Sequence, residues 1–343
     1  MSYLSPSEHR IWTRYMSTDK MRQYRRILET TPEMKRFSIH GGGDTGTVVD
    51  NDDDQILELA TAIVLHQGGE RSTLEEFTIE FFTVSVLSWN TLGNALRELP
   101  KLKRLFLRQV HVKNDDGETM PMLLTENLLS KCPTLEQLHM VDCHLNAMAA
   151  QDIARQLAMK HSRLQLLSLE GNSIGNVGVK CIGRVLEYNS SLLALDIDRV
   201  GCSMDAWVVL ADSLKHNQSL LRLSCSGNGG LDPAVEKVAL TSKSETTDTS
   251  SEIQSSLRHP FEEMICFNTT LLTIQPPRIT LQIEFHLRLN RAGRKWIGDE
   301  SMAKLFPRIL HRVRQDPDVV FYFLKAQSGT MLQTACGGTT IKS

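Results

Sequence analysis

The stretch LQLLSLEGNSIGNVGVKCIGRVLEYN, residues 164–189, is the clearest copy of a repeat in this chain of 343 residues. It opens with the pattern L-x-x-L-x-L. The same apolar pattern begins at Leu74, Leu102, Leu135, Leu164, Leu192 and Leu220, at intervals of 28, 33, 29, 28 and 28 residues. A weaker copy precedes this series at Met34, and a partial copy follows it at Leu271. A period of this length is typical of a solenoid, in which each repeat stacks on its neighbours.

Each repeat has a strand-like half and a helix-like half. The L-x-L segment alternates with period two, as in a β-strand. Farther along each repeat, apolar residues recur four apart, which is the spacing of one helix face. These pairs are Leu92/Leu96, Ile153/Leu157, Ile182/Leu186 and Leu210/Leu214. Because one such unit cannot bury its apolar edge alone, the predicted fold class is α/β, with parallel strands on one side of a stack and helices on the other.

This repeat resembles the leucine-rich repeat family, and within it the ribonuclease-inhibitor-like class with 28-residue repeats. The residues that carry the resemblance are Leu164, Leu167, Leu169, Asn172, Ile174, Gly175, Gly178, Ile182 and Leu186. The resemblance extends over residues 34–290 and implies a horseshoe-shaped solenoid with a concave parallel sheet and convex helices. It also implies a general tendency to bind proteins.

The family has an asparagine at the ninth repeat position, where its side chain satisfies backbone groups of the turn after the strand. At that position this chain has Asn172, Asn228 and Cys143, an accepted substitute, but also Phe82, Val110 and Val200. Buried backbone groups need partners. The turns with an apolar residue at this position must therefore satisfy their backbone in some other way or be looser.

The repeat array is predicted to cover residues 34–290 and to contain about seven or eight repeats. Because the end repeats expose apolar faces, helical caps are expected at residues 1–33 and 291–326. Residues 327–343 lack a core pattern and are predicted to be a disordered tail. Three insertions interrupt the period, near residues 41–54, 113–120 and 241–256.

Two segments leave alternatives open. Residues 241–256 are rich in Ser and Thr, which suits either an arm controlled by phosphorylation or a passive spacer. Over residues 279–289 apolar side chains alternate as in a strand, yet Ile283, Leu287 and Asn290 repeat the spacing found at the helix end of the clearest repeat. Because the repeat register is the stronger indication, we predict a helix there.

Composition argues against several classes of protein. The chain has 38 Lys and Arg against 40 Asp and Glu, so its net charge of −2 gives no global attraction to nucleic acid or membranes. It contains no 18-residue apolar run and no visible secretory signal, so we expect a cytoplasmic protein, with the nucleus as the alternative. Its seven cysteines form no C-x-x-C pair, which favours buried reduced thiols over disulfides or a zinc site.

Motifs for catalysis or cofactor binding are weak. Residues 41–46, GGGDTG, lack the lysine of a phosphate-binding loop, and no H-E-x-x-H occurs. Asp142, Cys143 and His144 are adjacent, but Cys143 occupies the turn position and should point inward. We therefore predict a non-enzyme without cofactor or metal. Three N-x-S/T triplets are interpreted as repeat-end turns, where asparagine is favoured; they begin at Asn189, Asn217 and Asn268.

The residues between the buried leucines should point onto the concave face of the sheet. Eight parallel strands give a face roughly 35–40 Å across, which is the size of a protein partner. Phe106 between two arginines has the composition of a binding hot spot, and acidic residues follow on later strands. We predict that a monomeric chain binds another protein, and neither nucleic acid nor membrane, through Arg104, Phe106, Arg108, His139, Glu170, Asp196 and Asp198.

The leading functional hypothesis is therefore a non-catalytic scaffold for protein interactions. Residues 37–277 carry 19 basic and 31 acidic side chains, a net charge of −12, which favours a basic partner. The alternative is a regulator of a small GTPase, a role of some ribonuclease-inhibitor-like repeat proteins. It would need an arginine or asparagine presented from a repeat loop, and Arg199 lies in such a loop.

Overall fold

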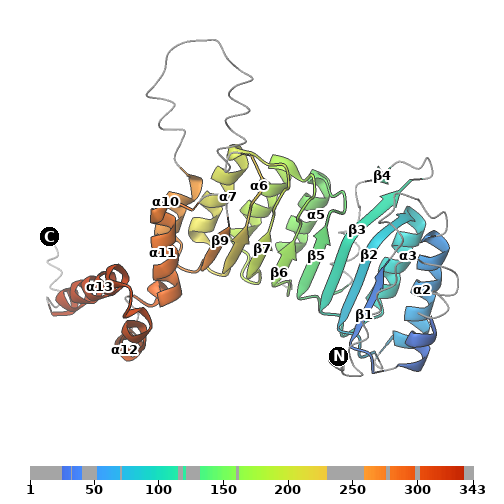
Figure 1. Cartoon of the computed structure of the whole chain (residues 1–343), viewed down its shortest axis with the longest axis horizontal. Helices are drawn as coiled ribbons and strands as arrows, with labels where there is room; N and C mark the ends of the chain where they lie inside the picture. Colours follow the sequence, from blue (N-terminus) through green and yellow to red (C-terminus); the bar gives the residue numbers. More distant parts are fainter. Residues whose placement is uncertain are drawn as a thin grey trace, which may run out of the picture.

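The structure is a computed structural model. It describes residues 25–31, 33–40, 52–69, 72–114, 119–120, 132–159, 162–229, 259–275, 279–297 and 302–335. The described elements form one elongated body, in which strands and helices follow one another along its length (Figure 1). The predicted N-terminal cap and the three predicted insertions lie wholly or partly outside these residues.

Eight parallel strands form one sheet in chain order, so that each repeat contributes a strand beside that of the preceding repeat. They are β1 (Arg36–His40), β2 (Glu76–Ser85), β3 (Arg104–Lys113), β5 (Gln137–Val141), β6 (Leu166–Ser168), β7 (Ala194–Asp196), β8 (Arg222–Ser224) and β9 (Thr273–Gln275). A short strand, β4 (Thr119–Met120), pairs antiparallel with β3. The predicted α/β solenoid with a parallel sheet is confirmed.

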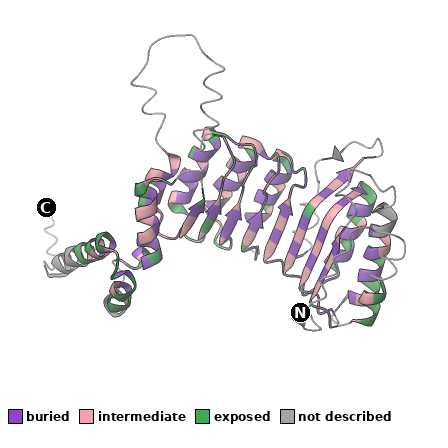
Figure 2. Ribbon diagram, in the orientation of Figure 1, coloured by how far each residue is buried: buried purple, intermediate pink, exposed green. Residues whose placement is uncertain are grey.

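The strands pair so that the fourth repeat positions are directly opposite one another. This row of buried side chains runs through Phe37, Phe77, Leu105, Leu138, Leu167, Leu195, Leu223 and Ile274. Its neighbours along each strand are less buried, as the alternation predicts (Figure 2). The register of the sheet therefore follows the leucine spacing of the sequence.

Helices cover one face of this sheet (Figure 1). They are α2 (Asp52–Gln67), α3 (Val86–Arg97), α5 (Ala147–Leu157), α6 (Gly175–Leu186), α7 (Met204–His216), α10 (Pro260–Phe267) and α11 (Leu281–Ala292). The apolar pairs predicted for α3, α5, α6 and α7 are all buried in one continuous core with the strand leucines. No helix among the described residues is both long enough and apolar enough to span a membrane.

The ambiguous segment near residue 283 is helical, as the repeat register predicted. Thr280 caps helix α11, because its side chain accepts a hydrogen bond from the backbone N–H of Ile283 at 3.3 Å. Ile283 and Leu287 are buried, whereas Leu281 is 91% exposed. In a strand, Leu281 and Ile283 would lie on the same face and be buried together. Their opposite burial is therefore that of a helix. Gly293 ends the helix in the left-handed conformation, at φ 109°.

Two further helices, α12 (Met302–Val313) and α13 (Pro317–Ala335), follow at the C-terminal end. They share a small separate core with the last turn of α11, made of Leu289, Ala292, Ile309, Val313, Val319 and Phe323. In Figure 1 this helical pair extends away from the sheet. Helix α13 continues past residue 326, where the tail was predicted to begin. Its start is capped by Asp316, whose Oδ1 accepts from Val319 N at 3.3 Å, so Asp316-Pro317 begins a helix.

Each asparagine at the ninth repeat position serves two turns. The Asn172 Oδ1 accepts from the backbone N–H groups of Cys143 and Leu145, in the preceding repeat, at 2.9 and 3.0 Å. Its Nδ2 donates to carbonyls of both repeats, including Met140 at 2.6 Å and Leu169 at 2.8 Å. One asparagine therefore satisfies its own turn and that of a neighbour that lacks one.

Asn228 repeats this arrangement for the turn of Val200, since its Oδ1 accepts from Val200 N at 2.8 Å. The turns of Phe82 and Val110 use another solution, because β2 and β3 continue past the turn and pair Phe82 with Val110. The expectation that these three turns need other partners is thus confirmed.

A second row of asparagines lies where each helix returns to the next strand. Asn217 donates to Leu186 O at 2.6 Å, and its Oδ1 accepts from Leu220 N at 2.7 Å. Asn268 makes the equivalent bonds to Leu214 O and Leu271 N, at 2.7 and 2.8 Å. Both side chains are buried. These N-x-S/T triplets are therefore structural turns, as predicted.

Replacing Asn172 with alanine should lower the free energy of unfolding by about 3 kcal/mol, because it leaves buried N–H and C=O groups of two turns without partners. The matched control is Asn176→Ala, since Asn176 bonds only the exposed Ser203; it should cost less than about 1 kcal/mol. Urea unfolding measures both variants. Equal losses would contradict the shared-asparagine interpretation.

Candidate protein-binding site on the open face of the sheet

The open face is defined here as the face of the sheet that carries no helices. All of the residues predicted to bind a partner lie on it, or at its edge directly after a strand. Strand β3 carries Arg104, Phe106 and Arg108, and β5 carries His139. Asp196 is the last residue of β7, while Glu170 and Asp198 lie just beyond the ends of β6 and β7. The strand register brings these side chains into adjacent rows.

One part of the open face is basic and aromatic. The Phe106 and His139 rings stack with their centres 4.4 Å apart and their planes 18° apart. The Arg108 guanidinium lies 5.9 Å from the centre of the Phe81 ring, a cation–π distance. Burial lowers the pKa of His139, outweighing the opposite influence of Asp196 and Glu76. Its imidazole is therefore neutral at pH 7, which suits a stacking surface.

Arg104 is not a free cation. Its Nε lies 2.8 Å from the Glu76 Oε2, and Arg36 approaches the same carboxylate at 3.6 Å. The pair is part-buried, and it neutralises much of the charge that Arg104 could offer to a partner. The sequence pattern could not reveal this, because the partner carboxylate belongs to another repeat.

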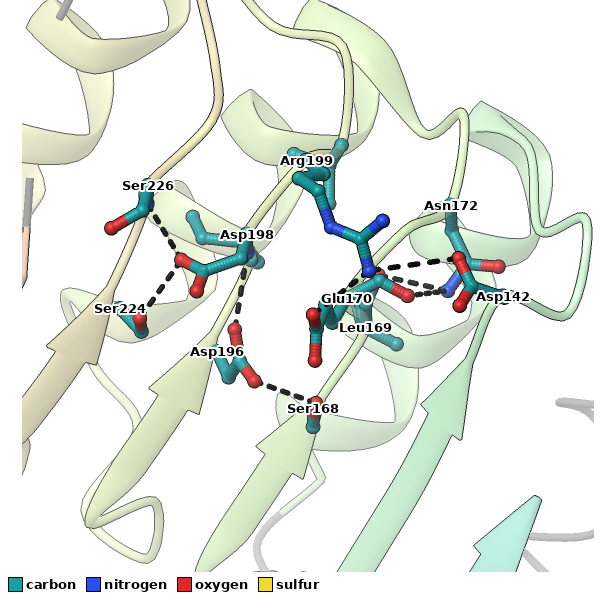
Figure 3. A network of polar contacts seen from close by, with 12 residues as sticks. Asp142, Ser168, Leu169, Glu170, Asn172, Asp196, Asp198, Arg199, Ser224 and Ser226 are labelled. Atoms are coloured by element: carbon teal, nitrogen blue, oxygen red, sulfur yellow. Dashed lines mark hydrogen bonds and ion pairs between the residues drawn. The ribbon is translucent and has the colours of Figure 1, made fainter. Parts of the chain in front are cut away.

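The other part of the open face is acidic, and its carboxylates are held in place (Figure 3). The Ser168 hydroxyl donates to the Asp196 Oδ2 at 2.9 Å, and the Asp196 Oδ1 accepts from the backbone N–H of Asp198 at 3.1 Å. The Asp198 Oδ1 accepts from the Ser224 hydroxyl at 2.8 Å and from Ser226 N at 2.6 Å. These bonds run across three strands and orient both aspartates.

Arg199 joins this acidic part. Its guanidinium lies 2.9 Å from the Glu170 carboxylate and 3.8 Å from that of Asp142, and the hydrogen bond to Glu170 raises the pKa of Arg199. Burial raises the pKa of Asp198, although the bonds from Ser224 and Ser226 oppose the shift. Counting Asp142, Glu170, Asp196, Asp198 and Arg199, this acidic cluster has four carboxylates and one cation. It therefore attracts a cationic group.

Asp142 and Arg199 were not among the predicted binding residues, yet a shared repeat position marks them. The residue seven places after the first leucine has a positive φ in six consecutive repeats. These residues are Phe81, Gln109, Asp142, Gly171, Arg199 and Gly227, with φ between 48° and 74°. This left-handed conformation favours glycine. Only Gly171 and Gly227 signal it in the sequence.

The two glycines also make room for the charged side chains beside them. A Cβ at Gly171 would lie 1.8 Å from the Asp142 Oδ1, and a Cβ at Gly227 would lie 2.7 Å from the Arg199 Cγ. Both distances are far below van der Waals contact. The alternation of glycine and charged residues along this row therefore lets Asp142, Glu170 and Arg199 approach one another.

The adjacent residues Asp142, Cys143 and His144 do not turn their side chains to one place, as expected from the turn position of Cys143. The Cys143 Sγ points inward, 3.3 Å from Val141 O and 3.5 Å from Leu107 O. Burial raises the pKa of Cys143 to about 12, which disfavours the thiolate that binds metals. Among the described residues, no three His, Cys, Asp or Glu side chains are close enough to hold a metal ion. The glycine-rich residues 41–46 lie outside the described part of the chain.

The eight-stranded parallel sheet, its buried leucine row and the shared asparagines define a leucine-rich repeat solenoid with repeats of the ribonuclease-inhibitor-like class. No family model matches the chain. A ribonuclease inhibitor from Mus musculus is 30% identical to it over 161 residues, which are 45% of this chain and 33% of the inhibitor. The chain thus matches about a third of that protein.

A solved structure of leiomodin-1 actin-binding site 2 (ABS2) shares 13% sequence identity with this chain. It covers 48% of this chain and 84% of its own, with a TM-score of 0.36.

Replacing Gln109 with glycine should raise the free energy of unfolding by about 1 kcal/mol, because Gln109 has a positive φ of 48° that glycine adopts without steric cost. Gln137→Gly is the control. Gln137 lies in the regular strand β5, so glycine there should lower the free energy of unfolding by about 1 kcal/mol. Thermal or urea unfolding reports both. If the two variants shift stability in the same direction, the strain assigned to this turn is absent.

Replacing Asp198 with asparagine should stabilise the fold at pH 7 while retaining both hydrogen bonds to its Oδ1. The pKa of Asp198 in the folded protein is raised above its usual 3.8. Ionisation of Asp198 therefore lowers the free energy of unfolding as the pH rises from 3.8 to the raised pKa. The gain should therefore be full above the raised pKa and vanish below pH 3.8. Unfolding curves across pH test it. If the stability gained by the variant grew as the pH was lowered, the pKa of Asp198 would be lowered in the folded protein and not raised.

Proposed function

We propose that this protein is a non-catalytic interaction scaffold that binds a basic surface of another protein on the open face of its sheet. The observation that carries the proposal is the acidic cluster, in which Asp196 and Asp198 are oriented by hydroxyl and backbone groups of neighbouring repeats (Figure 3). Complementary charge of this kind favours specific and fast association.

The dimensions of the open face support a macromolecular partner. Eight parallel strands at 4.7–4.9 Å span roughly 35–40 Å, close to what a standard protein interface needs on one partner. Several side chains of this face are already bonded to one another across neighbouring strands, as in the pairs of Arg104 with Glu76, Ser168 with Asp196 and Ser224 with Asp198. Such pre-organisation reduces the ordering cost of binding.

The partly aromatic composition of the same face adds support. The Phe106 and His139 rings stack on adjacent strands, and His139 lies one strand from Ser168 and two from Asp196 in the same row of the sheet. Aromatic anchors beside charged groups are typical of the few residues that dominate binding energy. We propose Phe106, His139 and Arg108 as anchors, and Glu170, Asp196 and Asp198 as the groups that select a basic partner.

The similarity to a ribonuclease inhibitor supports a protein-binding role, because its name describes a protein that acts on another protein. The alternative role, regulation of a small GTPase, would require an arginine free to reach a nucleotide. Arg199 is instead bonded to Glu170 and close to Asp142. Its positive charge is already engaged, so we favour the scaffold.

Reversing two carboxylates of the open face, in the double variant Glu170→Lys and Asp196→Lys, should weaken partner binding more than tenfold, because like charges would then face the basic surface. The matched control, Glu98→Lys and Asp205→Lys, makes the same charge change at exposed residues at the ends of α3 and α7. Affinity capture followed by mass spectrometry finds the partner. Titration of the purified partner then measures the loss.

Binding of the unaltered chain should also fall steeply with salt, as expected for opposite charges at an interface. The proposal is wrong if the open-face variant and the control bind equally well. It is also wrong if the captured partner is acidic over its contact surface.

A further inference from the structure

The C-terminal end of the chain differs in charge from the repeat array. Residues 37–277 have a net charge of −12, whereas residues 278–315 carry nine basic and three acidic side chains, a net charge of +6. Part of this positive charge is already engaged. Arg288 and Arg291 are paired with carboxylates, and Arg294 is buried. The arginines of helix α12 are engaged in neither way.

Helix α12 contains no acidic residue and carries two exposed arginines, Arg308 and Arg312. They are four residues apart and therefore lie on the same face of the helix. No ion pair among the described residues includes either of them, and Arg312 makes only a long hydrogen bond, to the Arg291 carbonyl at 3.4 Å. The apolar side of α12 is covered, since Ile309 belongs to the small C-terminal core. We call Arg308 and Arg312 the arginine pair of α12.

The arginine pair matches the acidic cluster of the open face in spacing as well as in charge. Side chains four residues apart on a helix have Cβ atoms about 5–6 Å apart. Asp196 and Asp198 are two residues apart along an extended segment, which separates them by about 7 Å. Glu170 lies on the neighbouring repeat, about 5 Å from Asp198 across the sheet. Two guanidinium groups on one helix face can therefore each approach a carboxylate of this cluster.

The two surfaces lie in different parts of the chain. Helix α12 packs against α11 and α13, and the pair of helices α12 and α13 extends away from the sheet (Figure 1). The acidic cluster lies on the open face, at the ends of β6 and β7. Among the described residues, no ion pair joins the arginine pair to this cluster. The projecting helix is thus placed to meet the open face of another copy of the chain.

We propose that the arginine pair of α12 in one copy binds the acidic cluster of the open face in a second copy, so that the chain associates head to tail. This rests on the proposed function, because it uses the same acidic cluster and names the basic surface that the cluster binds. Since the contact joins two different surfaces, it can extend beyond a dimer as the concentration rises. The monomer expected from the sequence then holds only in dilute solution or at high salt, where the charges are screened.

Analytical ultracentrifugation of the full chain measures this association. The average mass of the unaltered chain should rise with protein concentration and return toward that of a monomer when the salt is raised from about 0.05 M to about 0.5 M. The α12 variant, Arg308→Glu with Arg312→Glu, should weaken the association more than tenfold, because like charges then face each other. The matched control, Arg97→Glu with Lys101→Glu, makes the same charge change at exposed residues at and after the end of α3. It should associate like the unaltered chain.

Mixing two variants tests whether these two surfaces meet. The open-face variant, Glu170→Lys with Asp196→Lys, keeps the arginine pair, and the α12 variant keeps the acidic cluster. Each should remain monomeric alone, and an equimolar mixture should associate, because each supplies the surface that the other lacks. A mixture that stays monomeric overturns the proposal. So does an unaltered chain that stays monomeric at every concentration, including one whose α12 binds vesicles of anionic phosphatidylserine instead.

The outcomes also separate this proposal from the proposed function. If the unaltered chain stays monomeric but captures a different basic protein, and the open-face variant loses that protein, only the head-to-tail association is wrong. If the chain neither associates with itself nor binds a basic protein through its open face, both proposals are wrong. The concentration and salt dependence of the unaltered chain decides the association even where a variant fails to fold.

Discussion

The row of buried side chains at the fourth repeat position is the constraint on which the rest of the structure depends. It aligns each strand directly with its neighbour, from Phe37 to Ile274. Because side chains alternate between the two faces of a strand, a slip of one residue would exchange the buried and the open faces. The same leucine spacing that closes the core therefore also determines which side chains reach the open face.

That constraint explains how much could be predicted. Leucine periodicity predicts the strands, the helices and the outward direction of Phe106 or Asp196, because all of these depend on local sequence. Two ion pairs could not be predicted, because their residues are far apart in the sequence. Arg104 and Glu76 are 28 residues apart, and Arg199 and Glu170 are 29 residues apart. Such contacts depend on which rotamers the neighbouring repeats allow.

Backbone conformation set a second limit on prediction. A left-handed turn is visible in sequence where Gly171 occupies it, but the same turn is built from Gln109 and Arg199 in other repeats. There the stacked strands impose a conformation that the residue alone disfavours. The C-terminal helices show a related limit: Asp followed by Pro occurs both at chain breaks and at helix starts, and the cap at Asp316 shows that a helix starts here.

The two parts of the open face differ in what binding would cost them. In the basic part, Arg104 must loosen its pair with Glu76 before it can serve a partner. In the acidic part, Asp198 is already partly removed from water, as its raised pKa indicates, while hydroxyl and backbone donors occupy only its Oδ1. Much of the desolvation that opposes a charged interface has thus occurred during folding. A cation that approached Asp196 and Asp198 would gain its attraction at a smaller further cost, so in the proposed function this cluster would be the stronger determinant of the partner's charge.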